Sequence, residues 1–253
     1  MSIPKFWVKW LEEFYEKTKN SIFINKYSEK VAVLIEPRQH PLLKLVIYNF
    51  MYFLAPKGWS LCIVCGTDNS DFVDKECTGL NYSKIVLPFD NLIEPLYNMV
   101  LTNAGFYKTI KEKYRSTELE KEAKHILIFQ TDTILLRDIE EFLKFSYIGA
   151  PWRHTLHLGK GMNGGLSLRN IDEMINICKT REYKVLDNED GYFSFSNNDK
   201  LINYPMIQDA MRFSVETCWY TDEAPCGFHA AYKFQPHEKL ERCLKKRFEE
   251  LFK

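Results

Sequence analysis

Apolar and polar positions alternate along this chain in two patterns, one typical of buried strands and one typical of helices. Short apolar runs that end at prolines, glycines or polar residues indicate strands buried on both faces. They cover residues 30–37, 60–67, 82–89, 125–132, 147–152 and 163–170. Segments with helical periodicity lie around them, at residues 8–20, 40–54, 91–123, 171–181 and 204–216. The segment 91–123 is expected to be broken near residues 102–105 and by the charged run 111–124. The alternation predicts an α/β protein whose sheet is parallel in its first half, with right-handed crossovers.

Prolines and turn residues refine these boundaries. Pro41 is expected in the first turn of its helix, and Pro205 near the start of the last predicted helix. Residues 188–197 are expected to begin a further helical turn, and residues 226–234 to form an extended tail.

The two halves of the chain are not separated by a low-complexity linker. We therefore expect a single domain over residues 29–253. Its front half, residues 29–133, is expected to bind a nucleotide, and its back half, residues 134–253, to bind substrate, because ligands of such sheets bind beyond the carboxyl ends of the strands.

The N-terminal residues 1–28 are expected to add an amphipathic helix. Its apolar stripe faces away from its lysines and glutamates. The stripe consists of Trp7, Trp10, Leu11, Phe14 and Tyr15. Docking on the domain is the expected role; peripheral contact with a membrane surface or with another subunit is the alternative.

Composition narrows the function classes. The 253 residues are 45% hydrophobic and 15% aromatic, which predicts a folded chain. Thirty-four basic and 34 acidic residues give a net charge of +0, which argues against a nucleic-acid-binding surface. Neither an apolar run near the roughly 20 residues of a transmembrane helix nor a signal-peptide core is found. We therefore expect a soluble, cytoplasmic protein.

Cysteine spacing indicates buried thiols. There are seven cysteines, and one pair, Cys62 and Cys65, has C-x-x-C spacing. A redox pair of this type normally opens a helix. Here both residues fall within the predicted strand 60–67, which favours core packing.

Asp132 stands at the carboxyl end of the predicted strand 125–132, where a ligand would approach. An acid in this place either caps the following turn or holds a divalent cation together with a bound phosphate, since Mg²⁺ and Mn²⁺ prefer oxygen ligands. Taken alone, the residue leaves both functions open.

Three later segments carry further candidate chemistry. Glycines in residues 161–165 let the backbone approach a bound group closely, or form a bulge. Glu189 and Asp190 offer a general base, or acids in the first turn of a helix. His229 offers a metal ligand, or a buried core histidine.

Taken in this order, the segments resemble the GT-A fold glycosyltransferase superfamily and, within it, a glycosyltransferase-like family of unknown function (DUF5672-like). The resemblance is carried by "IEPR.HPLL", "ILIFQTDT", "YIGAPWR", "NGGLSLR", "NEDGYFS", "RFSVET" and "GFH". These stretches stand at residues 35–43, 126–133, 147–153, 163–169, 188–194, 212–217 and 227–229. The resemblance implies a Rossmann-like, nucleotide-sugar-binding sheet flanked by helices, with the N-terminal helix as an addition.

The resemblance also implies roles for the nucleotide side of the site. Gln130-Thr131-Asp132 occupies the place of the D-x-D motif, with glutamine in place of the first acid. It implies that Asp132 and His229 hold Mn²⁺ or Mg²⁺, and that Gln130 reaches the ribose or a metal-bound water. Further nucleotide-sugar contacts are implied for Glu36, Arg38, Gly66, Thr67 and Thr131.

The sugar side follows from the same resemblance. Asn163, Gly164 and Gly165 are implied to lie under the donor sugar, and Trp152 and Arg153 on the acceptor side. Core packing is the alternative for Trp152.

The resemblance also suggests the reaction. A UDP- or GDP-sugar would transfer its sugar to a hydroxyl of a glycan or protein acceptor, with inversion. Asp190, or failing that Glu189, would act as the base.

Three rival functions remain. A nucleotidyltransferase would usually carry a glycine-rich loop after the first strand, and "IEPRQHPLL" contains no glycine. A sugar- or nucleotide-binding protein without catalysis is compatible with Gln130. A zinc site at His154 and His157 lacks matching ligands nearby in the sequence.

Overall fold

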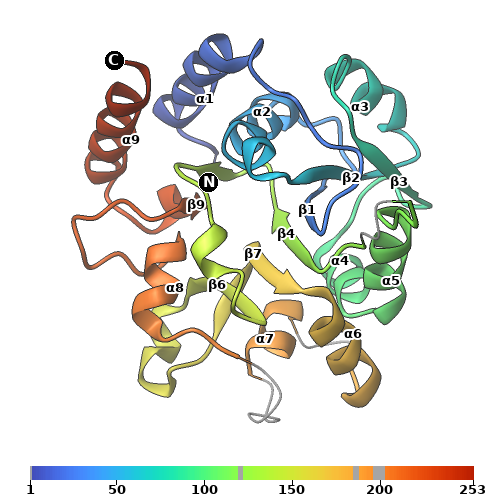
Figure 1. Ribbon diagram of the computed structural model, residues 1–253. Coiled ribbons are helices and arrows are strands. Elements are labelled where there is room, and N and C mark those ends of the chain that lie inside the picture. The colour runs from blue at the N-terminus through green and yellow to red at the C-terminus, as the bar shows by residue number, and fades with distance from the viewer. Residues whose placement is uncertain (1, 119–121, 185–187, 196–202) are drawn as a thin grey trace.

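A six-stranded sheet forms the centre of the molecule (Figure 1). The computed structural model describes residues 2–118, 122–184, 188–195 and 203–253. The strand order is β3-β2-β1-β4-β7-β6. The strands are β1 (Lys30–Ile35), β2 (Ser60–Gly66), β3 (Ser83–Leu87), β4 (His125–Phe129), β6 (Tyr147–Pro151) and β7 (Met162–Asn170). The strands β1 to β4 are mutually parallel where they pair, whereas β7 runs antiparallel to both β4 and β6. The predicted α/β class and the parallel front half are therefore confirmed.

Helices cover both faces of this sheet (Figure 1). One face carries α1 (Lys5–Thr18), α2 (Leu43–Leu54) and α3 (Ser70–Glu76). The other face carries α4 (Glu94–Leu101), α5 (Ala104–Lys113) and α6 (Ile171–Thr180). The parallel strands are therefore buried on both sides, and all seven residues of β2, including Cys62 and Cys65, are buried. The thiols of the described cysteines are free, as the core-packing interpretation predicts.

A second, three-stranded sheet of order β5-β9-β8 extends from the end of β4. Its strands are β5 (Thr133–Leu135), β8 (Ser214–Val215) and β9 (Gly227–His229). The strand β9 pairs antiparallel with β5 and parallel with β8. Because only residues 130–132 separate β4 from β5, the C-terminal strand β9 is brought to the carboxyl edge of the large sheet.

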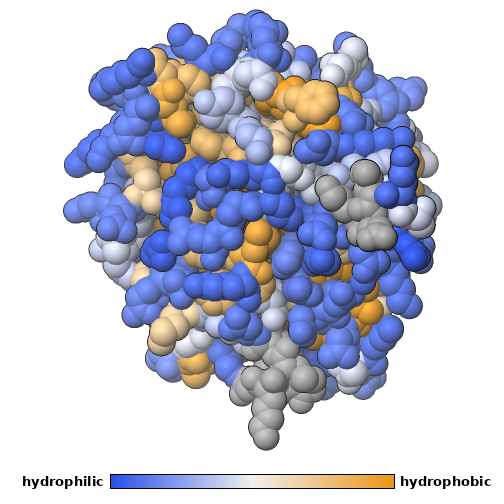
Figure 2. Space-filling view, in the orientation of Figure 1, coloured by the Kyte–Doolittle hydropathy of each residue, from blue (hydrophilic) through white to orange (hydrophobic). Residues whose placement is uncertain are grey.

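Two helices at the ends of the chain pack against each other. Trp10 of α1 donates a hydrogen bond from Nε1 to the Leu244 carbonyl of α9 (His237–Phe252), 2.9 Å away. Figure 2 shows hydrophobic residues gathered between these two helices. Four of the five residues in the predicted apolar stripe of α1 are buried, and Tyr15 packs edge-on against the Tyr48 ring. The helix is therefore docked on the domain.

Several predicted boundaries were wrong. Pro41 and Pro205 precede their helices rather than lying within them, and α8 (Ile207–Phe213) ends before the strand β8. Residues 226–234 are not an extended tail, because the 3-10 helix η4 (Ala231–Lys233) begins one residue after the end of β9. The helix α9 was not predicted at all. The helical turn at the acidic pair is α7 (Glu189–Ser194); residues 196–197 of that prediction lie outside the described part of the chain.

None of the helices in the described part of the chain combines the length and the apolar character needed to cross a membrane.

Candidate functional site

A cavity of about 430 Å³ opens where β1 and β4 end side by side. This is the point at which the strand order reverses, with β2 and β3 on one side and β7 on the other. In open α/β sheets, ligands bind outside the carboxyl ends of the strands at such a point. The cavity is lined by Ile3, Ile35, Glu36, Pro37, Arg38, His40, Leu92, Glu94, Tyr97, Gln130, Thr131, Asp132 and Tyr232.

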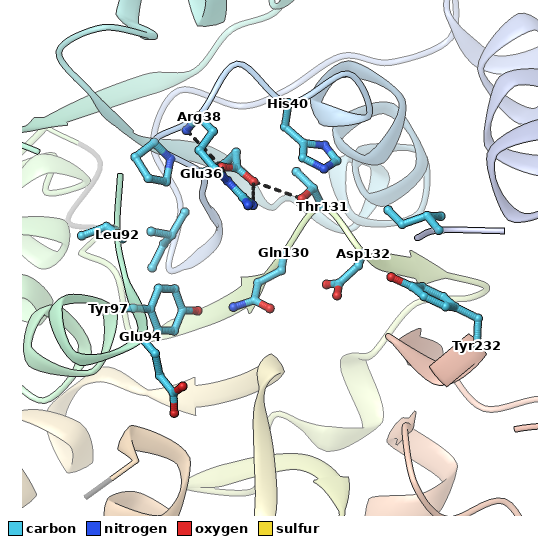
Figure 3. Close-up of a pocket in the computed structure, with 13 residues that line it drawn as sticks. Glu36, Arg38, His40, Leu92, Glu94, Tyr97, Gln130, Thr131, Asp132 and Tyr232 are labelled. Atoms are coloured by element: carbon cyan, nitrogen blue, oxygen red, sulfur yellow. Dashed lines mark hydrogen bonds and ion pairs between the residues drawn. The ribbon is translucent and has the colours of Figure 1, made fainter. Parts of the chain in front are cut away.

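The end of β1 supplies a fixed carboxylate at this cavity. Glu36 is buried, and its two oxygens accept hydrogen bonds of 2.7 and 2.8 Å from the guanidinium of Arg38. Thr131 donates from Oγ1 to the same carboxylate across 3.1 Å (Figure 3). The fork geometry orients Arg38 at the cavity entrance while leaving most of its side chain exposed. Three of the predicted nucleotide contacts thus form one hydrogen-bonded group.

Asp132 follows the end of β4, and its carboxylate points into the cavity, as does the side chain of Gln130 (Figure 3). Asp132 Oδ1 is buried and has no hydrogen-bond partner among the described residues. Asp132 Oδ2 lies 3.4 Å from Lys233 Nζ. A buried carboxylate oxygen without a partner is unfavourable in isolation, so this atom is available to a cation or a donor.

His229 reaches Asp132 through the pairing of the two short strands. Residue Thr133 of β5 is directly opposite His229 of β9. This register sets His229 Nε2 at 3.6 Å from Asp132 Oδ1 and 3.2 Å from Gln130 Oε1. Burial lowers the pKa of His229, but the carboxylates of Asp132 and Glu216 outweigh it, and the pKa is raised overall.

These donors fit a divalent cation in part. Within the described ranges, no group of three or more His, Cys, Asp or Glu side chains is arranged around a common point. Asp132 and His229 are the two residues whose side chains could act as ligands, and the amide oxygen of Gln130 lies beside them. Mg²⁺ and Mn²⁺ sites in proteins often combine one or two side chains with phosphate oxygens of the substrate. The unpartnered Asp132 Oδ1 meets that requirement.

Two consecutive glycines of β7 leave room for side chains of other segments, which approach the strand from its two opposite faces. A Cβ atom on Gly164 would collide with Glu189 Oε1, and one on Gly165 would collide with His229 Nε2. Because successive residues of a strand face opposite sides, the two contacts do not compete. Asn163 Oδ1 accepts a 2.7 Å hydrogen bond from the Gly165 amide near the start of β7. The sequence "NGG" is thus explained by close approach on both faces.

Glu189 is engaged in a buried ion pair. Its carboxylate lies 3.0 Å from Arg169 Nη2, and both side chains are almost completely buried. The guanidinium also lies over the rings of Tyr147 and Phe193, each with its centroid 5.2 Å away. Burial raises the pKa of Glu189, and the attraction of Arg169 opposes that rise. Such a carboxylate is held in place rather than free to exchange a proton.

Asp190, by contrast, has the properties of a base. Its side chain is half-buried, and Oδ1 accepts only a local 2.8 Å hydrogen bond from the Gly191 amide among the described groups. Burial, and then the neighbouring Glu189 carboxylate, raise the pKa of Asp190 to about 7. A general base is most effective when its pKa is near the working pH.

Asp190 and His229 both line a smaller cavity of about 130 Å³ next to the first. The two cavities share Glu94, Tyr97 and Gln130. The remaining lining residues of the smaller cavity are Asn98, Asn163, Gly165, Asn188 and Glu189. Carboxylates and amides thus dominate this space, which favours a neutral ligand rich in hydroxyl groups.

The other predicted residues lie outside both cavities. Gly66 is the last residue of β2 and Thr67 follows it; Thr67 donates a hydrogen bond from Oγ1 to Asp90. Trp152 and Arg153 follow β6; Trp152 stacks on His154 with ring centroids 5.5 Å apart, and Arg153 is exposed. Gly164 also lines neither cavity, unlike Asn163 and Gly165 on either side of it. The structure therefore does not bring these five residues to the cavity walls.

Some residues at the site were not predicted from the sequence. Tyr97 lines both cavities, and its hydroxyl is buried without a hydrogen-bond partner among the described residues. The ammonium group of Lys233 lies next to the Asp132 carboxylate, and the guanidinium of Arg169 forms an ion pair with Glu189. Of these, only Arg169 carried a sequence signal, as a charged residue at the end of an apolar strand.

Replacing Gly165 by alanine is expected to lower the free energy of unfolding by about 1–3 kcal/mol, the usual result of overpacking. The added methyl group would collide with the ring of His229. Because the imidazole is rigid, the whole side chain would have to move. Gly191→Ala is the matched control, because the nearest atom to a Cβ there is 3.8 Å away. Urea unfolding measures both variants; equal free energies would contradict this account of the strand.

Asp190→Asn is expected to stabilise the protein at high pH. A carboxyl whose pKa is raised in the folded state resists ionisation, so wild-type stability falls as pH rises from about 4 to about 7. A rise of one unit in the pKa corresponds to about 1.4 kcal/mol in the free energy of unfolding. Because the group is only half-buried, we expect Asp190→Asn to raise the free energy of unfolding by about 2 kcal/mol at pH 8. The gain should vanish at pH 4.

Urea unfolding at the two pH values tests this expectation. Asp222→Asn, which removes an exposed acid, is the control for a change of net charge. A gain of the same size at pH 4 and pH 8 would show that Asp190 is not held protonated by the fold.

Known proteins resemble this chain at the level of the family and of the fold. No curated protein matches the sequence significantly. Mouse xyloside xylosyltransferase 1 in its apo form has 11% identity over 82% of this chain and 99% of its own, with a TM-score of 0.48. The galactosyltransferase LgtC, solved with donor and acceptor sugar analogs, has 9% identity over 85% of this chain and 95% of its own, with a TM-score of 0.46.

A third structure belongs to another class. The 4-diphosphocytidyl-2C-methyl-D-erythritol synthase of Anaerococcus prevotii has 10% identity over 67% of this chain and 82% of its own, with a TM-score of 0.42. At identities of 11% or lower, none of these similarities bears on the activity of this chain.

A protein family, unlike these solved structures, matches this chain at the level of its sequence. Residues 92–229, more than half of the chain, match the family described as "Protein of unknown function (DUF5672)". The matched segment includes Asp132, the two glycines of β7, the acidic pair and His229. On this match, the chain belongs to the DUF5672 family.

Proposed function

We propose that this protein is a GT-A glycosyltransferase that moves a sugar from a nucleotide-sugar to an acceptor hydroxyl, with a divalent cation and with inversion. One observation carries the proposal. The unpartnered Oδ1 of Asp132 lies beside His229 and Gln130 at the switch point of the sheet. A buried carboxylate oxygen of this kind suits a metal-bound diphosphate better than it suits a purely structural function.

The larger cavity is the proposed nucleoside site. Ile35, Pro37 and Leu92 give it an apolar wall, and the Glu36–Arg38 pair gives it fixed polar groups. Its volume of about 430 Å³ lies within the range typical of small-molecule pockets. The uridine or guanosine moiety would occupy this space, with its diphosphate directed toward Asp132.

Asp132 and His229 would hold Mn²⁺ or Mg²⁺ against the diphosphate. When bound, the cation would neutralise charge that develops on the leaving group. Lys233, whose Nζ is 3.4 Å from Asp132 Oδ2, would add a second positive charge from the protein. Gln130 replaces one acid of the usual motif, so the chain supplies less negative charge to the cation than two carboxylates would.

The smaller cavity is the proposed sugar site. Asn163 and Gly165 form one side of it, and Asp190 stands on another. Asp190 would accept the proton of the acceptor hydroxyl while that oxygen forms a bond to the anomeric carbon. The bond from this carbon to the phosphate oxygen breaks, and the nucleoside diphosphate leaves with the electron pair. Attack from the face opposite the leaving group inverts the configuration.

Trp152 and Arg153 would meet the acceptor, a glycan or a protein, outside the two cavities. Trp152 packs against His154 and Phe195, and the latter closes the helix α7 that carries Asp190. An aromatic surface near the base is a suitable place for a sugar ring to stack.

Release of nucleoside diphosphate tests the proposal. UDP- and GDP-sugars would be supplied with Mn²⁺, with Mg²⁺ and with EDTA. We expect metal-dependent release from one donor, reduced at least about 100-fold in Asp132→Ala, since loss of a charge-stabilising group costs several kcal/mol of transition-state stabilisation. Asp222→Ala, in an exposed loop, is the control.

Binding measurements on the same samples separate the alternatives. Tight nucleotide binding without turnover, in the presence of a range of acceptors, would favour a binding protein without catalysis. Absence of binding to any nucleotide would reject the proposal.

The pH dependence gives an independent prediction. Because Asp190 must be ionised to accept a proton and its pKa is about 7, kcat/KM should fall about tenfold per pH unit below pH 7. This acid limb should disappear in Asp190→Asn together with most of the activity. An acid limb centred near pH 4 in the wild type would instead indicate an unperturbed carboxylate.

A further inference from the structure

Another cavity, of about 1120 Å³, lies between α9, the end of α8 and the loop 219–224. The helices α8 and α9 stand on the same side of the molecule (Figure 1). The cavity shares no lining residue with the two cavities of the candidate site. Six of its lining residues are basic and three are acidic, whereas the whole chain has 34 of each. Positive charge is therefore concentrated at this cavity.

The helix α9 supplies most of this charge, and it does so on one side only. Its residues His237–Phe252 include five lysines and arginines and four glutamates. The basic residues that line the cavity are Lys239, Arg242, Lys246 and Arg247, and the glutamate that lines it is Glu250. Lys245 lies instead in the groove between α9 and α1, together with Glu241 and Glu249. The helix is nearly neutral as a whole, so its charges are sorted by face.

Three of the six basic residues are balanced by acids. Arg137 Nη1 lies 2.7 Å from Glu141 Oε1, and Arg212 Nη2 lies 2.6 Å from Glu141 Oε2. Arg247 Nη1 lies 3.0 Å from Glu250 Oε2. These ion pairs fix the positions of the three arginines and offset much of their charge.

The other three basic residues have no acidic partner within the described ranges. Lys239 Nζ donates hydrogen bonds only to carbonyl groups, those of Trp219 and Thr221, at 3.2 and 3.1 Å. The side chains of Arg242 and Lys246 are exposed and form neither a hydrogen bond nor an ion pair in the described part of the chain. Residues spaced by three and four positions are neighbours on one helix face, and like charges there repel each other. A bound anion would remove this repulsion.

The wall opposite α9 is held in place. Trp219 Nε1 donates a 3.1 Å hydrogen bond to the Glu223 carbonyl, which closes the loop on itself. The Trp219 ring packs against Phe228 of β9, and Lys239 Nζ lies 4.1 Å from the ring centroid. The loop is thus tied both to the small sheet and to α9, so the cavity is preformed.

The geometry of the three unbalanced cations indicates the chemistry of a ligand. Arginine binds phosphate oxygens through its fork of donors, and lysine binds them as a point charge. Lys239, Arg242 and Lys246 extend over about 10 Å of the helix axis, at about 1.5 Å per residue. This length exceeds one phosphate group. A recess between a loop and a helix also suits a discrete ligand better than it suits a flat membrane surface.

We propose that this cavity is a second binding site, for a soluble ligand that carries two or more phosphate groups. Lys239, Arg242 and Lys246 bind the phosphates. Asp222 and Glu223, the exposed acids of the loop, repel them and limit the affinity. The site is independent of the proposed function, because none of its residues lies in the candidate active site.

The first experiment titrates inorganic tripolyphosphate into the full chain by calorimetry, at low ionic strength and with EDTA. We expect the wild type to bind, and the double variant Arg242→Gln/Lys246→Gln to bind roughly 10-fold more weakly or worse, since two charge-assisted contacts are lost. Lys245→Gln removes a lysine from the other side of the same helix and should bind as the wild type does.

Thermal unfolding of each variant verifies that the protein is folded, which exposed side chains of α9 should permit. Absence of binding by the wild type would overturn the proposal. Equal affinities of the wild type and the folded double variant would overturn it as well.

The loop acids give a test of opposite sign. Asp222→Asn/Glu223→Gln should bind tripolyphosphate more tightly than the wild type, because two negative charges that face the ligand are removed. The difference should shrink as salt is added, since exposed charges are screened. An affinity that is unchanged or weaker at low ionic strength would contradict the placement of the ligand between the loop and α9.

Two further samples exclude other locations. Asp132→Ala should retain tripolyphosphate binding; its loss there, with wild-type binding by the double variant, would place the phosphates at the candidate active site and overturn the proposal. Vesicles of phosphatidylcholine with and without phosphatidylglycerol test a membrane contact. Binding to the anionic vesicles without binding to tripolyphosphate would also reject a site for a soluble ligand.

Discussion

The close approach of ionisable side chains to the backbone of β7 is the constraint on which the site depends. Gly164 is in contact with the carboxylate of Glu189 on one face, and Gly165 with the ring of His229 on the other. A β-carbon at either position would push its neighbour away. The strand therefore keeps the Glu189 carboxylate and the His229 ring on opposite faces of a single peptide backbone, each closer to that backbone than a larger residue would allow.

Burial of charge around this strand is tolerated because each ion has a counterpart. Arg169 meets Glu189 at 3.0 Å and lies near the rings of Tyr147 and Phe193, 5.2 Å from each centroid. An arginine and a glutamate without each other would be strongly destabilising in that position, whereas the pair is close to neutral in free energy. Burial raises the pKa of the neighbouring Asp190, and the Glu189 carboxylate beside it raises this pKa further, while Arg169 only partly opposes the rise.

The sequence predicted those parts of the molecule that local patterns determine. Buried strands such as 60–66 and the amphipathic helix α1 follow from periodicity, and the position of Asp132 follows from the end of an apolar run. The helix α9 was missed even though Leu240, Leu244 and Phe248 have helical spacing.

Other features are determined by contacts between distant segments, which no local pattern contains. The distance from His229 to Asp132 is set by strand pairing across 96 positions of the chain, since Thr133 is paired with His229. The preference for Asp190 over Glu189 as base depends on Arg169, which lies 20 positions before Glu189. A single sequence shows two adjacent acids; only the fold shows that one of them is neutralised and the other is not.

The turn between the two sheets explains why the polar segment 130–132 interrupts an apolar run. The strand β4 belongs to the large sheet and β5 to the small one, so the backbone must leave one set of hydrogen bonds and enter another within three residues. Part of this demand is met locally: the Asp132 carbonyl accepts a 3.0 Å hydrogen bond from the Ala230 amide. That bond sets the backbone next to His229 directly beside Asp132. The chain needs polar residues where it passes from the large sheet to the small one. Because β9 pairs with β5 in the small sheet, the same passage also places His229 next to Asp132, at the candidate metal site.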